Sequence, residues 1–250
     1  MKFHNTGQEN ETVLKKLVII AALEREITPL VRGWDASTVS SQDRDLRVFQ
    51  QGDAVVVCGG IGSMSARAAC DWAYKEAKGE VGLFISTGLV GALNPEFKVG
   101  DLFQPACIID EADDLSLLTN KGHGVLVSAG AISGQKLKKI LAEKHHADAV
   151  DMEAYAVADV ARIYNVSFIA IKAVSDEFDF PMPPLGRFVS ETGEFKTAGF
   201  AIYAAMRPWL WSTVFQLGKN STKATQALCK ELEKTIAQYS ACEYNIVTAK

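Results

Sequence analysis

The feature that most constrains the fold is a succession of apolar segments between residues 148 and 176. A short apolar run ends at Val150. From Ala154 to Tyr164 apolar residues recur at three- and four-residue spacings, which predicts an amphipathic helix. Val166 to Val174 is apolar on both faces apart from one lysine, as in a strand covered on both sides. Strand, helix and buried strand in this order predict an α/β protein.

Polar residues stand where these predicted elements begin and end. Met152 and Glu153 open the helix, and Ser175 and Asp176 end the buried strand. In open α/β sheets the ligand lies in the crevice beyond the carboxyl ends of the strands, so both carboxylates are predicted to face one pocket. Taken singly, Glu153 also fits a first-turn carboxylate favoured by the helix dipole. Asp176 also fits a turn residue or an N-cap.

A second strand end carries charge near the N-terminus. Leu17 to Ala22 fits a central strand, and Glu24, Arg25 and Glu26 follow it. These residues therefore stand at the edge of the sheet where ligands bind. A solvated first turn is the alternative interpretation, and it accounts well for Glu24 and Arg25.

A glycine-rich turn, Gly59 to Ser63, follows a predicted hairpin formed by Leu46 to Gln50 and Ala54 to Cys58. The turn opens a predicted helix that runs to Lys78, and such a turn can hold a phosphate. It has neither the Gly-Lys-Ser/Thr ending of a P-loop nor the GxGxxG spacing of a dinucleotide site. The pattern favours a tight strand-to-helix turn over a phosphate site.

Charge and cysteine content exclude several classes of protein. The net charge is −4 and no stripe of lysine or arginine occurs, which argues against a nucleic-acid partner. The five cysteines are scattered and form no CxxC pair, which indicates reduced thiols in a cytoplasmic protein rather than a zinc site. Residues 1–16 are polar and lack the apolar core of a signal peptide, so we predict a flexible N-terminal tail.

The C-terminal part, residues 196–240, is predicted to be helical. Residues 198–217 form a long apolar segment that is interrupted by Arg207-Pro208, which argues against a membrane-spanning helix. A core or dimer-interface helix is the first interpretation, and contact with a membrane surface is the alternative. Ser221 is a plausible N-cap for a polar amphipathic helix that continues to Tyr239.

Four segments together resemble the nucleoside phosphorylase and nucleosidase superfamily, most closely its 5′-methylthioadenosine/S-adenosylhomocysteine nucleosidase branch. They are VDMEAYAVA at 150–158, IKAVSD at 171–176, TGLVGAL with KVGD at 87–101, and SAGAISG at 128–134. The resemblance covers residues 17 to about 179. It implies a single three-layer α/β/α domain over residues 17–250, with a central mixed, mostly parallel twisted sheet flanked by helices. It also implies a homo-oligomer.

The resemblance further implies hydrolysis of the N-glycosidic bond of an adenosine-type purine nucleoside, with no cofactor and no metal. Asp176 would protonate N7 of the leaving adenine, which a carboxyl group can do in a dry pocket that favours its protonated form. Ser175 and Lys172 would orient or tune it. Glu26 would activate the attacking water, and Glu153 would bind the ribose hydroxyls.

The other predicted contacts include two departures from the family pattern. Met152 would pack on the ribose, and Ala22 would approach it through its backbone. Leu89 stands where a serine is usual, and Ile132, followed by Ser133, replaces the aromatic residue that stacks on adenine. These changes weaken the inference to methylthioadenosine itself and leave room for an unusual 5′ substituent.

Three alternatives remain open at this point. The first is a phosphorylase with phosphate as co-substrate, in which Arg25 or Arg67 replaces the arginine loop that this chain lacks. The second is a hydrolase of a bulky 5′-substituted adenosine such as adenosylhopane. The third is a nucleoside-binding protein without catalytic activity.

Overall fold

The computed structural model describes residues 15–41, 44–119 and 121–248, with side chains described as far as residue 241. The predicted tail, residues 1–16, lies outside this part of the chain except for its last two residues. The described strands are β1 (Lys16–Ala21), β2 (Asp35–Ser41), β3 (Arg44–Gln51), β4 (Ala54–Cys58), β5 (Val81–Ala92), β6 (Leu102–Phe103), β7 (Cys107–Asp110), β8 (Ser116–Leu118), β9 (Val125–Ser128), β10 (Ala149–Asp151) and β11 (Ser167–Asp176).

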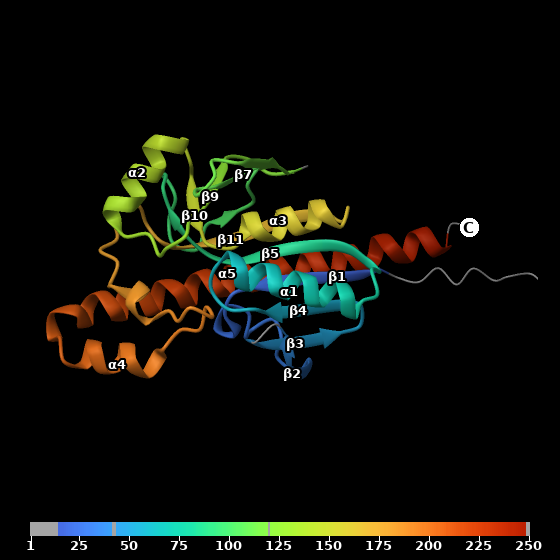
Figure 1. Ribbon diagram of the computed structural model, residues 1–250, viewed down its shortest axis with the longest axis horizontal. Coiled ribbons are helices and arrows are strands. Elements are labelled where there is room, and N and C mark those ends of the chain that lie inside the picture. Colours follow the sequence, from blue (N-terminus) through green and yellow to red (C-terminus); the bar gives the residue numbers. More distant parts are fainter. Residues whose placement is uncertain (1–14, 42–43, 120, 249–250) are drawn as a thin grey trace, which may run out of the picture.

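The described residues also form five α-helices and three short 3-10 helices. They are η1 (Glu24–Glu26), α1 (Ser63–Glu76), α2 (Gln135–His145), α3 (Ala154–Ile163), η2 (Leu185–Phe188), α4 (Thr197–Ala205), η3 (Pro208–Leu210) and α5 (Trp211–Thr248). Of these, η2, α4, η3 and α5 follow the last strand. Figure 1 shows α1 and α3 on one side of the sheet and α5 on the other, so the architecture has three layers, α/β/α.

All described strands belong to one mixed sheet. Its main path runs β2-β3-β4-β1-β5-β10-β9-β7-β8, and β11 joins β5 on one side and β6 on the other. The central pairs β4–β1, β1–β5 and β5–β11 are parallel, as are β10–β9 and β9–β7. The sheet is antiparallel towards its edges and where β10 meets β5. The predicted fold class is therefore confirmed.

The two faces of the sheet build separate halves of the core, as the period of two in a strand requires. Leu17 and Ile19 of β1 pack with Leu228 of α5. Val18 and Ile20 of the same strand belong to the opposite cluster, with α1 and α3. All four of these β1 side chains are almost fully buried. This covering of both faces explains the continuous apolar run that predicted a central strand.

Pairing and proline set the ends of three strands near the site. Residues 87–92 continue β5 to Ala92 because β11 pairs with β5 over most of its length. Residues 102–110 form two strands, β6 and β7, separated at Pro105, which has no N–H to donate to a ladder.

The C-terminal part is also divided differently from the prediction. Pro208 interrupts the apolar segment as expected, and it separates α4 from α5. Ser221 is not an N-cap, because α5 is continuous from Trp211 and the serine lies inside it. Figure 1 shows α4 folding back beside the first turns of α5 at one end of the molecule.

Candidate active site

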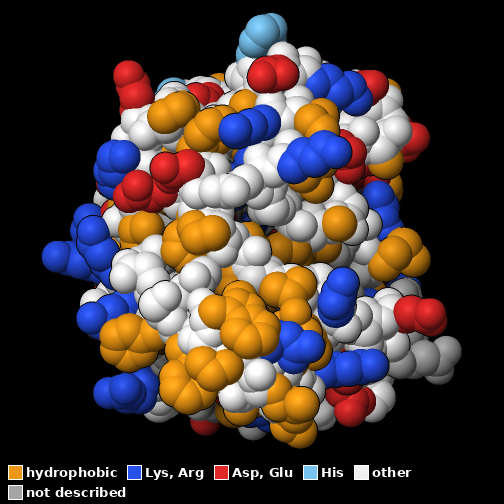
Figure 2. Space-filling model, turned by 90° about the vertical axis from the view of Figure 1, so that its left-hand side faces the viewer, with side chains coloured by type: hydrophobic (Ala, Val, Ile, Leu, Met, Phe, Trp, Pro, Cys, Tyr) orange, Lys and Arg blue, Asp and Glu red, His pale blue; other side chains and the backbone are white. Residues whose placement is uncertain are grey.

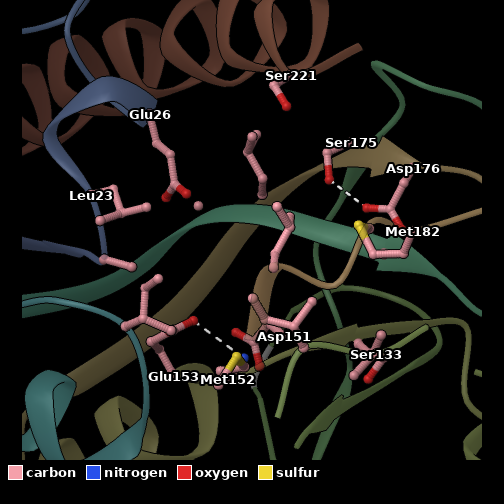
Figure 3. Close-up of a pocket in the computed structure, with 18 of the residues that line it drawn as sticks. Leu23, Glu26, Ser133, Asp151, Met152, Glu153, Ser175, Asp176, Met182 and Ser221 are labelled. Atoms are coloured by element: carbon pink, nitrogen blue, oxygen red, sulfur yellow. Dashed lines mark hydrogen bonds between the residues drawn. The ribbon is translucent and has the colours of Figure 1, made fainter. Parts of the chain in front are cut away.

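A pocket of about 180 Å³ lies beyond the carboxyl ends of β1, β10 and β11. All nine residues predicted for the site line it, although they come from five separate parts of the chain. They are Ala22, Glu26, Leu89, Ile132, Ser133, Met152, Glu153, Ser175 and Asp176. Figure 3 shows Glu26 and Glu153 on one side of the pocket and Ser175 and Asp176 on the other.

Glu26 ends the short helix η1 and its side chain is buried. Loss of hydration raises the pKa of Glu26 to about 7, and the nearby Glu153 carboxylate adds to this effect. One carboxylate oxygen of Glu26 lies only 3.1 Å from where a Cβ on Gly88 would be, so the glycine makes room for it. Glu26 can therefore both accept and release a proton near neutral pH.

Glu153 precedes the first turn of α3 and lies across the pocket from Asp176 (Figure 3). Its two oxygens accept hydrogen bonds from backbone N–H groups, one from Gly62 at 2.7 Å and one from Met152 at 3.2 Å. Burial, and then the neighbouring Asp151, raise the pKa of Glu153 to about 7, while Lys172 opposes the shift. The backbone therefore fixes the direction of this carboxylate.

Asp176 ends β11 and is buried. The Ser175 hydroxyl donates a hydrogen bond of 2.7 Å to Asp176 Oδ1, as the sequence analysis expected for the orienting residue. The other oxygen, Oδ2, forms an ion pair with Lys138, a fully buried residue of α2. Lys138 also donates to the backbone oxygens of Asp176 and Glu177, at 3.2 and 2.7 Å.

Lys138 is the residue that the sequence analysis missed. This lysine of α2 is buried against the end of β11, while Lys139 beside it is exposed. The contact needs Gly91, because a Cβ there would lie 2.9 Å from Lys138 Cε and 3.0 Å from Asp176 Oδ2. A lone lysine in a helix of four lysines carries no sequence signal that distinguishes it.

Lys172 forms a buried ion pair of 2.7 Å with Asp151. Its influence on Asp176 stays a prediction. Asp151 also accepts hydrogen bonds from the Ser128 hydroxyl and from the backbone N–H of Ala154. This cluster fixes the turn from β10 into α3, which carries Met152 and Glu153. Its charges act on the Glu153 carboxylate electrostatically: Asp151 raises the pKa of Glu153 and Lys172 lowers it.

Apolar side chains form much of the rest of the lining. Ile132 lies in the loop before α2, and Met182 and Leu185 come from the proline-rich segment after β11. That segment therefore forms part of the pocket wall. Ala22 lies at the end of β1, where its carbonyl oxygen accepts a hydrogen bond from Gly60 N–H at 3.0 Å.

A comparison with known protein families identifies the superfamily of this chain. The family model described as the phosphorylase superfamily matches residues 16–124 and 122–197, which is well over half of the chain. The chain belongs to the phosphorylase superfamily.

Solved structures of nucleosidases share the fold of this superfamily member at low sequence identity. The 5′-methylthioadenosine/S-adenosylhomocysteine nucleosidase of Helicobacter pylori is 16% identical, with a TM-score of 0.66 over 90% of this chain and 99% of that one. Futalosine hydrolase of the same organism is also 16% identical, with a TM-score of 0.65 over 90% and 98%. The Neisseria meningitidis 5′-methylthioadenosine/S-adenosylhomocysteine nucleosidase, in complex with methylthio-immucillin-A, is 19% identical, with a TM-score of 0.61 over 88% and 97%.

Three groups that the sequence suggested for binding phosphate have other partners in the structure. The Gly62 N–H, at the start of α1, donates to Glu153. Arg67 forms an ion pair of 2.7 Å with Asp159 and does not line the pocket. Among the described lining residues Arg25 is the single lysine or arginine, and its guanidinium lies 5.1 Å from the centre of the Phe195 ring.

A second cavity, of about 490 Å³, adjoins the site and shares six lining residues with it: Arg25, Glu26, Leu89, Leu185, Leu217 and Ser221. We call it the apolar chamber. Its other lining residues come mostly from α4, α5 and the turn after η1, and Phe195, Phe200 and Val214 are among them. Leu89, which replaces the usual serine, lies at the boundary between the two cavities.

Within the part of the chain that the structure describes, no group of three or more histidine, cysteine, aspartate and glutamate side chains is placed to hold a metal ion. Four cysteines are free thiols, and three of them, Cys58, Cys70 and Cys229, are buried. The side chain of Cys242 lies outside the described residues.

Proposed function

We propose that this protein is an N-glycosyl hydrolase that releases adenine from an adenosine-type purine nucleoside. The observation that carries the proposal is the convergence of Glu26, Glu153 and Asp176 on one pocket from separate parts of the chain (Figure 3). Cleavage of the bond between C1′ and N9 needs a proton for the base, negative charge beside the sugar and a water molecule on its far face. The pocket offers one carboxylate for each need.

The leaving-group half of the reaction belongs to Asp176 and Lys138. When the C1′–N9 bond breaks, its electron pair moves into the purine and N7 takes up a proton. Lys138 Nζ is paired with Asp176 Oδ2 inside the protein. We infer that the proton reaches N7 through the Asp176 carboxyl group and that Lys138, which contacts Oδ2, supplies it.

The nucleophile half belongs to Glu26 and Glu153. Glu26 takes a proton from water as the water oxygen bonds to C1′, for which a pKa near the working pH is well suited. Glu153, fixed by two backbone N–H groups, accepts from the ribose hydroxyls and stabilises positive charge that develops on the sugar. One proton passes from the Asp176–Lys138 pair to the base and one passes from water to Glu26, so nucleoside and water give adenine and the free sugar with no net gain or loss of protons.

Hydrolysis is favoured over phosphorolysis by the charges around the nucleophile position. Two carboxylates face that side of the pocket, and a phosphate dianion placed beside them would be repelled. The test is adenine release from a panel of nucleosides with and without phosphate. The proposal expects equal rates in both and free sugar as product. Phosphate-dependent release with ribose 1-phosphate would select the phosphorylase, and binding without cleavage at high protein concentration would select a nucleoside-binding protein.

The apolar chamber favours a substrate with a bulky apolar group on its 5′ carbon, of which adenosylhopane is one example. Leu89, which lines both cavities, places an apolar side chain where the family usually has a serine hydroxyl. The rest of the chamber wall is largely apolar. Steady-state rates on 5′-alkyl adenosines of increasing chain length test this preference. Rates that rise with chain length support it, whereas equal rates on methylthioadenosine and no cleavage of long-chain analogues would count against it.

We also propose that the enzyme works as a homo-oligomer in the cytoplasm without a cofactor. These three statements rest on the family to which the chain belongs and on its composition. Size-exclusion chromatography with light scattering tests the first of them.

A further inference from the structure

The segment from Phe195 to Lys230 differs in charge from the rest of the chain. It has five basic residues and no acidic residue, although the whole protein carries a net charge of −4. The basic residues are Lys196, Arg207, Lys219, Lys223 and Lys230. The match to the superfamily's family model ends at residue 197, so nearly all of this segment lies beyond it.

The same segment exposes large apolar side chains at the end of the molecule. We call this surface the tip face. Its five members are more than half exposed: Ile202 (64%), Met206 (72%), Trp209 (72%), Trp211 (56%) and Phe215 (67%). In Figure 2 apolar side chains gather over the lower half of this end of the molecule, with lysine and arginine side chains among and beside them.

Helix α4 shows that this exposure is not incidental. Its sequence, TAGFAIYAA, is apolar around almost its whole circumference, yet Ala204 is its only buried residue. A helix apolar on all sides is normally enclosed by protein or lipid. Exposed apolar clusters of this kind mark a surface that binds another protein or a membrane.

Aromatic rings and cations are interleaved on the tip face. The Arg207 guanidinium lies 3.7 Å from the centre of the Tyr203 ring, and Lys219 Nζ lies 4.8 Å from the centre of the Phe215 ring. The Trp211 indole N–H is satisfied by the Ala204 carbonyl oxygen at 3.0 Å. Apolar and aromatic side chains flanked by basic ones are the composition of helices that lie in the interface of a bilayer.

A second copy of the chain is a poorer occupant than a bilayer. A two-fold interface places the same patch of both subunits face to face, which would bring the basic residues of both tip faces together. No acidic residue of the segment is there to pair with them, so the like charges would oppose association. Anionic lipid headgroups carry the opposite charge, and each basic residue held near them contributes about 1 kcal/mol to binding.

We propose that the tip face docks the protein peripherally on an anionic phospholipid surface. No helix in the described part of the chain has the length and hydropathy to cross a bilayer. Elements α4 and α5 of the tip face also line the apolar chamber. Docking would therefore bring that chamber close to the lipid from which an apolar 5′ group is drawn, a consequence that rests on the proposed function. The docking itself does not.

Co-sedimentation of the full-length protein with lipid vesicles tests the docking without any substrate. We expect binding to vesicles of phosphatidylcholine mixed with phosphatidylglycerol, little binding to phosphatidylcholine alone, and weakening by added salt. Trp209→Ser combined with Met206→Ser should reduce binding to mixed vesicles at least about tenfold, since each buried apolar side chain contributes about 1.5–3 kcal/mol. Leu118→Ser is the matched control, because Leu118 is 83% exposed on β8, away from the tip face, and binding should be unchanged.

Charge is tested separately by Arg207→Glu with Lys219→Glu, which should abolish binding to mixed vesicles while the circular dichroism spectrum stays unchanged. Three results would overturn the proposal: no binding of the native protein to mixed vesicles, equal binding by the Trp209 double variant, or a native dimer that this variant converts to monomer in light scattering. Adenine release is assayed on the same samples without vesicles, so a failure of docking leaves the proposed activity untouched, and the reverse.

Discussion

Glu26 and Glu153 are two buried acids whose pKa values are set by the pocket around them. Loss of hydration is the main cause of both raised pKa values, and each glutamate has a second carboxylate nearby, Glu153 for Glu26 and Asp151 for Glu153. A pKa of about 7 leaves a fraction of each group ionised at neutral pH. The ionised form is the one that can take a proton from water.

Glu26→Gln and Asp176→Asn should each reduce kcat at least about a hundredfold, because each removes one proton transfer. Glutamine and asparagine keep the shape of the side chain, so circular dichroism and the unfolding temperature should show an intact fold. Glu24→Gln is the matched control, since Glu24 is exposed and pairs with Arg47 at the surface. Near-normal turnover in either variant would remove that residue from the mechanism.

The pH profile of kcat/KM should show an acidic limb with an apparent pKa of about 7. Below that pH Glu26 and Glu153 are protonated, so water is not activated and the charge on the sugar is not stabilised. For one such group the active fraction at pH 5 is about a hundredth of that at high pH. Because the two glutamates interact, the measured value belongs to the pair. A profile that is flat from pH 5 to 8 would contradict the assignment.

Lys138 should matter to stability as well as to turnover. Lys138→Met leaves the buried Asp176 carboxylate without its cation, which typically costs about 3–5 kcal/mol of unfolding free energy. Lys139→Met, one residue further along the exposed side of α2, should change the free energy by less than about 0.5 kcal/mol. Urea denaturation of both variants measures the difference. Equal stabilities would mean that Asp176 does not depend on this lysine.

At the scale of elements, β5 is the strand that joins the parts of the site. Its first half pairs with β1 and most of its length pairs with β11, both in parallel, and its end pairs with β10 in antiparallel fashion. Glu26, Lys138 and Asp176 lie against its glycines, Gly88 and Gly91. The glycines therefore let side chains of the site approach the strand closely.

Gly91→Ala should lower kcat/KM by between about tenfold and a hundredfold, because the added methyl group displaces Lys138 and Asp176 and small misplacements of catalytic groups are costly. Gly130→Ala is the control, since a Cβ at Gly130 meets nothing within 4 Å. Kinetics of both variants with one nucleoside measure the contrast. Unchanged kinetics in Gly91→Ala would show that the pair tolerates the displacement.

At the scale of the whole molecule, the site costs stability. Raising the pKa of Glu26 from 4.5 to about 7 means that ionising it in the folded protein costs about 3 kcal/mol more than in the unfolded chain. The folded state binds more protons than the unfolded state between these two pH values. Stability from this group is therefore fully present below pH 4.5 and is lost as the pH rises through 7.

Glu26→Gln should consequently be more stable than the native protein at pH 8, by up to about 3 kcal/mol, and nearly equal to it at pH 5. Glutamine stands in for the protonated glutamate and never has to be ionised. Unfolding temperatures of both proteins across this pH range measure the effect. A variant that is less stable at pH 8 would show that Glu26 is not an uncompensated buried acid.

The sequence by itself determined the layers and the edge of the sheet where the site lies. The continuous apolar run from Leu17 to Ala22 predicts a strand covered on both faces, and the spacing from Ala154 to Tyr164 predicts a helix, because both patterns follow from local geometry. Charged residues at the ends of apolar strands mark the carboxyl edge of the sheet, and this placed Glu26, Glu153 and Asp176 there. The other site residues were named from the resemblance to the nucleosidases.

Only the tertiary structure decided which charges meet. Lys138 pairs with Asp176 and Lys172 with Asp151, each across tens of residues, and one of several similar lysines cannot be matched to its carboxylate by spacing along the chain. The tertiary structure also decided that residues 87–92 are a strand and that the apolar face of α4 stays exposed. The physical reason is the same in each case: burial and pairing depend on neighbours in space, whereas a sequence pattern records neighbours along the chain.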